Sequence, residues 1–126
     1  MENVQSIGKS REDYLEAVLI QIKKNGACRS TDVATQLGYS KPSASIALKK
    51  LEDEGYIYRD EWKVLLTEKG LEIAEKTLAR HTFFKKFLMD AGIEERVAEE
   101  EACQIEHIFC EDSFCKLRNY IENKGS

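Results

Sequence analysis

A tight turn between two short helical segments constrains the fold of this chain more than any other feature. The pattern of residues 30–37 predicts a short helix that stops at Gly38, and Ser40 opens a second helix that ends near residue 54. The first turn of that helix holds Pro42, the one proline of the sequence, at a place where a missing N–H costs nothing. Two helices joined this closely predict a helix-turn-helix.

The segments on both sides extend this motif to a winged helix. Ser10 is predicted to cap a first amphipathic helix that ends near residue 25. After the helix-turn-helix, residues 56–59 and 63–66 are short β-like runs, which predict a hairpin. The order of three helices and a hairpin predicts an N-terminal winged helix-turn-helix, a DNA-binding domain, over residues 1–66.

The pattern of residues 67–126 predicts three more helices. Thr67 opens a long one that ends near residue 91, a second runs from about residue 94 to 110, and a last one from about 112 to 123. Their apolar face exceeds what a winged helix of this size needs to cover itself. Apolar helices appended to a DNA-reading module usually form a dimer interface, so we expect a mainly α protein with a small β-hairpin and a helical dimerisation domain. A larger monomeric core is the alternative.

Charge and cysteine usage narrow the class of protein. The chain has 19 Lys and Arg against 23 Asp and Glu, so an indiscriminate polyanion binder is excluded and DNA binding must be confined to a small surface. The sequence has no apolar run of membrane-spanning length and opens no signal peptide, which predicts a cytoplasmic protein. Thiols are reduced there, so the four cysteines are expected to be metal ligands or buried thiols. Cys28, Cys110 and Cys115 match no motif. Cys110 and Cys115 are too far apart for a Cys-x-x-Cys motif, so each is expected to be a buried thiol, with a redox role as the alternative.

The start of the second helix of the helix-turn-helix carries the candidate DNA contacts. In this motif the N-terminal residues of that helix meet base edges, while polar groups nearby hold phosphates. The expected base-edge contacts are Ser40, Lys41, Pro42, Ser43 and Ser45, and the expected phosphate contacts are Lys49, Lys50, Arg59 and Lys63. Few of these side chains make bidentate base contacts, so part of the specificity is expected to come from DNA shape and half-site spacing.

The run Cys-Gln-Ile-Glu-His in the second half of the chain is a candidate metal motif. On a helix, Cys103, Glu106 and His107 share one face. Thiolate, carboxylate and imidazole are the common protein ligands of first-row transition metals, so the three form half of a coordination shell. The alternative is that they serve only packing and solvation. Asp13 and Glu16 also share a helical face, although by themselves they are most simply partners of the helix dipole.

Five separated motifs occur along nearly the whole chain. They are Glu12-Asp13-Tyr14-Leu15-Glu16, Ser40-Lys41-Pro42-Ser43, Leu66-Thr67-Glu68-Lys69-Gly70, Ala79-Arg80-His81 and Glu101-Ala102-Cys103-Gln104-Ile105-Glu106-His107. In type and order they resemble those of the metal-dependent repressors of the diphtheria-toxin-repressor and manganese-transport-regulator family. The resemblance implies a metal-activated repressor of metal-uptake genes that binds a palindromic operator as a homodimer, and it implies that the chain is not an enzyme.

The resemblance also implies a ligand set. The implied ligands are Asp13, Glu16, His81, Cys103, Glu106 and His107, with Glu99 as a further candidate where one branch of the family has a histidine. They come from three helices of the family's fold, so the metal would join the DNA-reading half to the dimerising half. Binding would remove the repulsion between carboxylates and fix the spacing of two recognition helices.

The implied ligand set is a hybrid of the two branches of the family. Asp13 matches the manganese-responsive branch, whereas Cys103 matches the iron-responsive branch. A thiolate favours softer metals and carboxylates suit Mn(II), so we expect Fe(II) first and Mn(II) next, with Zn(II) and Co(II) also compatible. The family's ancillary metal position is acidic, but here it is Lys85, which opposes a second metal. The sequence ends at Ser126, so the SH3-like C-terminal domain of the longer members is expected to be absent.

Two other functions stay open at the level of the sequence. One is a metal-independent winged-helix transcriptional regulator, and the other is a winged-helix module that binds protein and never touches DNA. No membrane is expected as a partner, because no apolar run approaches membrane-spanning length. No small organic substrate is expected either, because no nucleophile motif or phosphate-binding loop accompanies the carboxylates.

Overall fold

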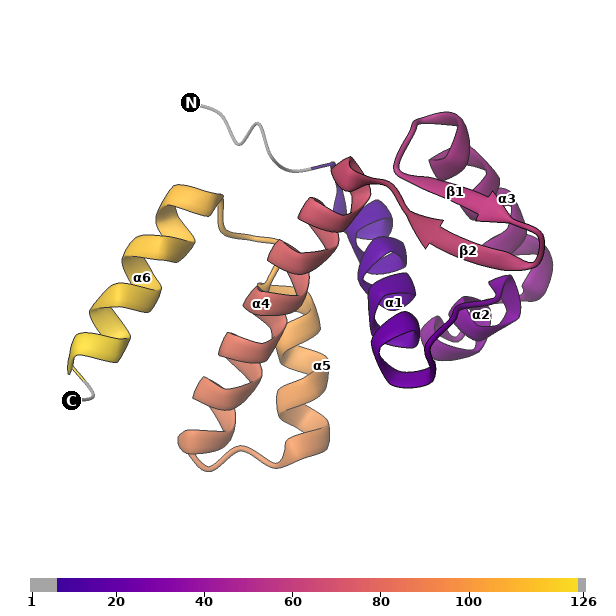
Figure 1. Ribbon diagram of the computed structural model, residues 1–126. Helices are drawn as coiled ribbons and strands as arrows, with labels where there is room; N and C mark the ends of the chain where they lie inside the picture. Colours follow the sequence, from indigo (N-terminus) through magenta and orange to yellow (C-terminus); the bar gives the residue numbers. More distant parts are fainter. Residues whose placement is uncertain (1–6, 125–126) are drawn as a thin grey trace. The chain divides into compact units, whose positions relative to one another are not determined.

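The computed structural model describes residues 7–124, which form helices and one two-stranded antiparallel sheet (Figure 1). In chain order the elements are α1 (Lys9–Asn25), α2 (Ser30–Leu37), α3 (Lys41–Asp53), β1 (Ile57–Asp60), β2 (Lys63–Leu66), α4 (Glu68–Asp90), α5 (Glu95–Ile105) and α6 (Glu111–Lys124). The mainly α fold with a small hairpin is confirmed. None of the helices in this part of the chain combines the length and apolar character that crossing a membrane requires.

The chain folds as two compact units. The first unit comprises residues 9–76, and the second comprises residues 77–124 together with Ile7 and Gly8, so α4 is divided between Lys76 and Thr77. The first turns of α4 therefore group with the hairpin and the helices before it. The expected domain boundary at residue 66 stays a prediction.

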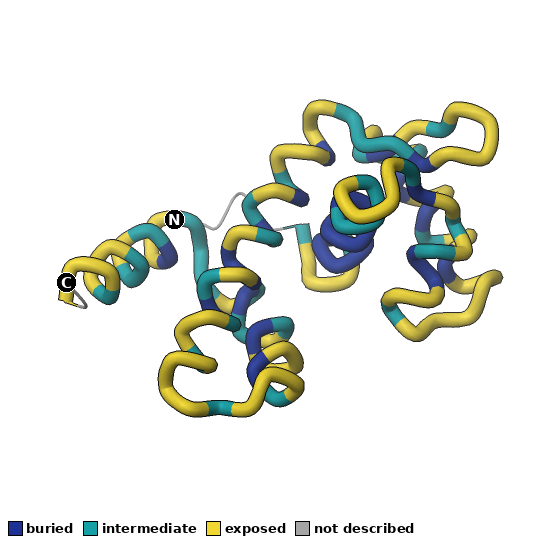
Figure 2. The backbone as a smooth tube through the Cα atoms, turned by 60° about the horizontal axis from the view of Figure 1, so that its bottom comes forward, coloured by how far each residue is buried: buried dark blue, intermediate teal, exposed yellow. Residues whose placement is uncertain are grey.

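The first unit is a winged helix-turn-helix. Within it α1 packs against α2 and β2, and α3 packs against α2 and β1. Figure 2 shows how continuously α1 is buried, over Glu12–Leu19. The apolar core takes side chains from every element: Leu15, Val18, Val33, Leu48, Leu51, Ile57 and Val64. In the hairpin Ile57 lies opposite Leu66.

Backbone caps fix the turn of the helix-turn-helix, as predicted. Gly38 ends α2 in the left-handed conformation, with a φ of 77°, which favours glycine. Ser40 is the N-cap of α3, because its Oγ accepts a hydrogen bond of 3.2 Å from Ser43 N. Pro42 lies in the first turn of α3. A few neighbouring residues therefore determine the direction in which α3 leaves α2.

One predicted helix start is wrong. α1 begins at Lys9, so Ser10 lies inside the helix and is not its N-cap. The ammonium of Lys9 bonds the carboxylate of Asp13 at 2.8 Å, one turn further on. Pairs of opposite charge four residues apart stabilise a helix, which favours the longer α1.

Two small residues set the joint between the hairpin and α4. The hydroxyl of Thr67 donates to the carbonyl of Gly55 at 2.8 Å and accepts from Gly70 N at 3.1 Å. A Cβ at Gly70 would overlap the carbonyl oxygen of Tyr56. The Leu-Thr-Glu-Lys-Gly motif is thus a helix cap followed by a residue that must lack a side chain.

The second unit has an aromatic core. Phe84 of α4, Ala102 of α5 and Phe114 of α6 are buried together, and Phe83, Ile105, Phe109 and Leu117 pack against them. The ring centroid of Phe84 lies 5.5 Å from that of Phe109 and 5.7 Å from that of Phe114. Such pairs contribute about 0.5–1.5 kcal/mol beyond the burial of their area. They hold the three helices of this unit together.

α5 ends at Ile105, earlier than predicted. Arg80 accounts for the early end, because its Nη1 donates to the carbonyl oxygens of Glu106 at 3.3 Å and Phe109 at 2.8 Å. A side chain thus satisfies carbonyls that a longer helix would pair with its own N–H groups. Glu106 keeps a helical backbone as the C-cap, but His107 lies in the turn beyond. The prediction that the whole metal motif lies on one helix is wrong to that extent.

The cysteines are free thiols. Cys28 is buried, and burial raises the pKa of its thiol to about 12. Cys110 and Cys115 are only half-buried, so the expectation of buried thiols is wrong for both. They lie at the polar start of α6, where Cys110 Sγ is 3.4 Å from Ser113 Oγ and Cys115 Sγ is 3.6 Å from Glu111 Oε2.

Candidate metal centre

His81 of α4 lies between two carboxylates of its own unit. Its Nδ1 is 2.7 Å from Glu106 Oε1, and its Nε2 is 2.9 Å from Glu99 Oε2. Glu106 is only 1% exposed, whereas Glu99 lies at the exposed edge of α5. The ring of His81 is itself buried. A buried imidazole with a carboxylate at each nitrogen is an arrangement that holds positive charge.

The cluster around His81 holds a proton. Hydrogen bonding with Cys103 and Glu106 raises the pKa of His81 to about 11, while burial opposes the rise and Glu99 adds to it. At neutral pH His81 is therefore an imidazolium, and each of its N–H groups donates to a carboxylate. Because an imidazolium has no free lone pair, a metal ion binds His81 only after displacing this proton.

Further ligand atoms surround His81. One atom each of His81, Glu99 and Cys103 lie within 4.8 Å of one another. His107 Nε2 lies 3.2 Å from Glu106 Oε2. The second unit thus gathers every predicted ligand that belongs to it: a thiol, two imidazoles and two carboxylates.

The buried carboxylate of Glu106 tests whether a metal fits. Its Oε2 receives no well-aligned hydrogen bond from any residue between 7 and 124, although His107 Nε2 approaches it. Leaving a buried polar atom without a partner costs about 1–3 kcal/mol, and more for a charged one. A divalent transition metal would satisfy this oxygen and take the place of the proton on His81. The donor set therefore fits such an ion.

Asp13 and Glu16, the two remaining predicted ligands, belong to the first unit. They lie one helical turn apart on α1, and both are buried. The carboxylate of Asp13 forms an ion pair with Lys9. A buried carboxylate stays charged only where positive groups or hydrogen-bond donors compensate it. The part of Asp13 and Glu16 in metal binding stays a prediction.

Arg80 is a positioning residue whose role the sequence analysis missed. Besides the carbonyl of Glu106, it bonds Glu111 Oε1 through Nη2 at 2.8 Å. Its guanidinium also lies over the ring of Phe114, 5.4 Å from the centroid. Arg80 therefore fixes the turn that carries two of the candidate ligands. Its place beside His81 in the Ala-Arg-His motif was the available signal.

The predicted DNA contacts occupy the exposed side of the helix-turn-helix and the hairpin. The exposed members are Ser40, Lys41, Pro42, Ser43, Ser45, Lys49, Lys50 and Lys63. Arg59 differs, since it is half-buried and its Nη1 donates to Ser30 Oγ at 3.0 Å. Exposure is compatible with DNA contact, but the contacts themselves stay predictions.

Ile46 of α3 is a candidate DNA contact that the sequence analysis missed. Its side chain is 73% exposed, whereas Ala44, Leu48 and Leu51 of the same helix are buried. An exposed aliphatic side chain on a recognition helix suits the methyl group of thymine. The spacing was the available signal, because Ala44, Leu48 and Leu51 define a buried face that excludes Ile46.

The turn of the hairpin carries a second candidate of this kind. Trp62 is exposed, and the guanidinium of Arg29 lies 4.1 Å from its ring centroid. Lys63 Nζ lies 5.6 Å from the same centroid. Two cations beside an exposed aromatic ring suit contact with a phosphate backbone. The only tryptophan of the sequence, between two β-like runs, was the signal.

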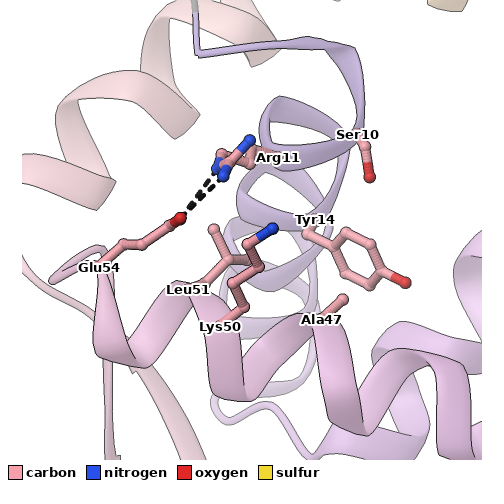
Figure 3. Close-up of a pocket in the computed structure, with 7 residues that line it drawn as sticks. All are labelled: Ser10, Arg11, Tyr14, Ala47, Lys50, Leu51 and Glu54. Atoms are coloured by element: carbon pink, nitrogen blue, oxygen red, sulfur yellow. Dashed lines mark hydrogen bonds and ion pairs between the residues drawn. The ribbon is translucent and has the colours of Figure 1, made fainter.

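A double hydrogen bond joins α1 to the end of α3 (Figure 3). Arg11 Nε and Nη2 donate to the two carboxylate oxygens of Glu54 at 2.9 Å and 2.7 Å. This bonding raises the pKa of Arg11 and lowers that of Glu54, because it favours both charged forms. The pocket beside the pair is lined by Ser10, Arg11, Tyr14, Ala47, Lys50, Leu51 and Glu54. The recognition helix is therefore bound to α1 at its C-terminal end.

Both units match known proteins. The model of the iron dependent repressor N-terminal DNA binding domain matches residues 6–63, and that of the iron dependent repressor metal binding and dimerisation domain matches residues 67–124. An uncharacterised HTH-type transcriptional regulator of Methanocaldococcus jannaschii is 38% identical over 92% of this chain and 95% of its own. The transcriptional regulator MntR of Escherichia coli is 30% identical over 91% of this chain and 75% of its own.

A solved structure shows the same fold. The structure of the manganese regulator SloR is similar with a TM-score of 0.77 and 27% identity, over 90% of this chain. The match covers 53% of the SloR chain, so this chain spans about half of that protein's length.

Proposed function

The chain belongs to the iron-dependent repressor family, and on this basis we propose that it represses metal-uptake genes by binding a palindromic operator as a homodimer when it holds a divalent transition metal. The family consists of metal-dependent transcriptional repressors and not of enzymes. The operator, the homodimer and the regulated genes are the parts that the proposal adds.

The cluster around His81 is the observation that carries the proposal. A bound divalent ion would supply the positive charge that compensates the buried carboxylate of Glu106, a charge that the imidazolium of His81 supplies in the metal-free chain. His81, Glu106 and His107 hold the ion, and the thiol of Cys103 binds after losing its proton. A thiolate ligand favours Fe(II), carboxylates keep Mn(II) next, and Zn(II) and Co(II) are compatible with the same donors.

Coupling to DNA is proposed to run through α1. The family resemblance adds Asp13 and Glu16 of α1 to the ligands of the ion. Because Arg11 of α1 bonds Glu54 at the end of α3, a metal that restrains α1 restrains the recognition helix as well. In a homodimer the two recognition helices are then held at the spacing of successive major grooves. By linkage, operator DNA tightens metal binding by the same factor.

Anaerobic metal titration with operator affinity as the readout tests the proposal. The operator is first selected from random duplex DNA in the presence of metal. We expect Mn(II), Fe(II), Co(II) and Zn(II) each to raise the affinity for DNA, with Fe(II) effective at a lower free concentration than Mn(II). A chain whose operator affinity is indifferent to chelators would be a metal-independent regulator, and one without salt-dependent DNA binding would be a protein-binding module.

A double variant tests the ligands themselves. Cys103→Ala combined with His107→Ala should abolish the metal-dependent rise in operator affinity and leave the circular dichroism of the metal-free chain unchanged. Cys110→Ala is the matched control, because that thiol lies outside the cluster around His81. A double variant that responds to metal like the control would contradict the ligand assignment.

A further inference from the structure

Lys85 lies at the outer edge of the metal centre, one helical turn after His81 on α4. Its Nζ is 3.1 Å from Glu99 Oε1 and 3.2 Å from Glu95 Oε2. The other oxygen of Glu99, Oε2, faces His81 Nε2 at 2.9 Å. One carboxylate is therefore shared between the cluster around His81 and the ammonium of Lys85.

α4 and α5 carry this arrangement as a ladder of alternating charge. Glu99 lies between two cations of α4, the imidazolium of His81 and the ammonium of Lys85. Hydrogen bonds to Glu99 and Glu95 raise the pKa of Lys85. Burial works against ionisation of Glu99, but hydrogen bonds from His81 and Lys85 outweigh it and lower the pKa of that carboxyl.

We propose that Lys85 is a built-in cation that restricts the centre to one metal ion per protomer. The inference rests on the proposed function, because it takes the cluster around His81 as the site of the first ion. A second divalent ion at the outer edge needs Glu99 together with Glu95. The ammonium of Lys85 already bonds both carboxylates and repels a cation that approaches them.

The neighbouring lysine shows what an ordinary surface ion pair looks like in this helix. The side chain of Lys86 is 76% exposed and bonds Asp90 of the same helix at 2.8 Å. The side chain of Lys85 is 29% exposed and bonds two carboxylates of another helix. The carboxylates that Lys85 bonds, those of Glu95 and Glu99, are 68% and 48% exposed, and ion pairs open to solvent contribute little to stability, so removing either lysine should leave the fold intact. Lys86 is thus a matched control for Lys85.

Metal stoichiometry of the full metal-free chain tests the proposal. Bound Mn(II) is counted by electron paramagnetic resonance and Co(II) by anaerobic calorimetry. The unaltered chain should take one ion per protomer. Lys85→Glu removes the ammonium and adds a carboxylate, so it should take a second ion at least about tenfold more tightly than the unaltered chain does. Lys86→Glu changes the charge by the same amount and should keep one ion.

Further variants identify the groups involved. Lys85→Arg keeps the positive charge and should keep one ion. Glu95→Gln added to Lys85→Glu should remove the second ion and leave the first in place, because Glu95 contacts Lys85 and belongs to no ligand set of the first ion. Lys85→Gln, with a smaller gain expected, decides the question if Lys85→Glu does not fold.

The outcomes separate this inference from the function on which it rests. Two ions on the unaltered chain would overturn the role of Lys85 and leave the proposed repressor intact. One ion on folded Lys85→Glu and Lys85→Gln chains would do the same. An unaltered chain that binds no ion would overturn the proposed function, and the inference with it.

Discussion

Most of the side chains expected to meet DNA come from α3 and its cap and are exposed to solvent, with Arg59 and Lys63 on the hairpin, whereas the ligands of the second unit come from two helices and a turn and face one another. On α3, neighbours on the surface are neighbours in sequence. In the metal centre, His81 and Glu106 are in contact across 25 residues of chain. Substituting one DNA-facing side chain is therefore expected to lower the affinity for DNA by a moderate amount and independently of its neighbours. A ligand is expected to act through its neighbours, because removing it leaves their charges buried without partners.

The largest effect that this comparison predicts is that of Glu106→Gln. The change keeps the size of a buried side chain and removes the charge that faces His81. Affinity for Mn(II), measured by calorimetry, should fall at least about a hundredfold, because even residues that only support a ligand contribute 10–100-fold. Glu101→Gln, at an exposed position of α5, is the control. Equal affinities of the two variants would show that the metal binds elsewhere.

Arg80→Met should have the next largest effect, this time on stability. Arg80 bonds two carbonyls and the carboxylate of Glu111, so its removal should cost about 2–3 kcal/mol in the free energy of unfolding. Arg118→Met is a matched control, because the guanidinium of Arg118 lies 5.1 Å from the ring centroid of Phe114 and that of Arg80 5.4 Å. Chemical denaturation of the metal-free chain measures both. Equal losses would assign the effect to the ring and not to the carbonyls.

Metal affinity should depend on pH in one direction only. The pKa of His81 is raised from 6.5 to about 11, so the proton stabilises the folded metal-free chain fully below pH 6.5, and this stabilisation is lost as the pH rises towards 11. Metal displaces this proton. The proton of His81 alone should therefore make affinity rise about tenfold per pH unit between roughly pH 7 and 9, and the proton that the thiol of Cys103 loses on binding can only add to this slope.

Calorimetry in buffers of different ionisation enthalpy counts the protons released on metal binding. The variant His81→Gln has no such proton and should show a correspondingly weaker pH dependence. Release of no proton by the unaltered chain would show that His81 is neutral before the metal arrives.

Ile46→Ala should have the smallest effect. The side chain is 73% exposed, so the fold should keep its stability, while affinity for the operator falls by roughly fivefold. Operators in which uracil replaces thymine lack the methyl group that Ile46 is expected to contact. The unaltered chain should bind such an operator more weakly, and Ile46→Ala should not distinguish the two DNAs. If the losses of affinity caused by Ile46→Ala and by the uracil operator simply add, Ile46 contacts something other than a thymine methyl.

Most of the fold could be predicted from signals within a few neighbouring residues of the sequence. Gly38, Ser40 and Pro42 act through the backbone of their own turn, so the helix-turn-helix could be predicted from them alone. The end of α5 could not, because Arg80 reaches its carbonyls from another helix. Periodicity describes one element at a time and contains no information on such a contact.

The ligands of the metal centre also divide into those that local spacing predicts and those that it does not. Cys103 and Glu106 were found from their spacing along the chain, whereas His81 entered only through the family resemblance. No helical period joins His81 to Glu106, since the two meet only when α4 and α5 pack together. The resemblance already implied that Lys85 opposes a second metal, whereas the contacts of Lys85 with Glu95 and Glu99 appear only when α4 and α5 pack together.

The absence of room beside Gly70 also has a consequence for how this sequence tolerates change. Even a single methyl group there would collide with the peptide that closes the hairpin, and no side-chain rotation relieves a clash at Cβ. In a saturation library selected for folding, this codon should return glycine alone. Glu68, two positions earlier and open to solvent, should accept nearly every residue.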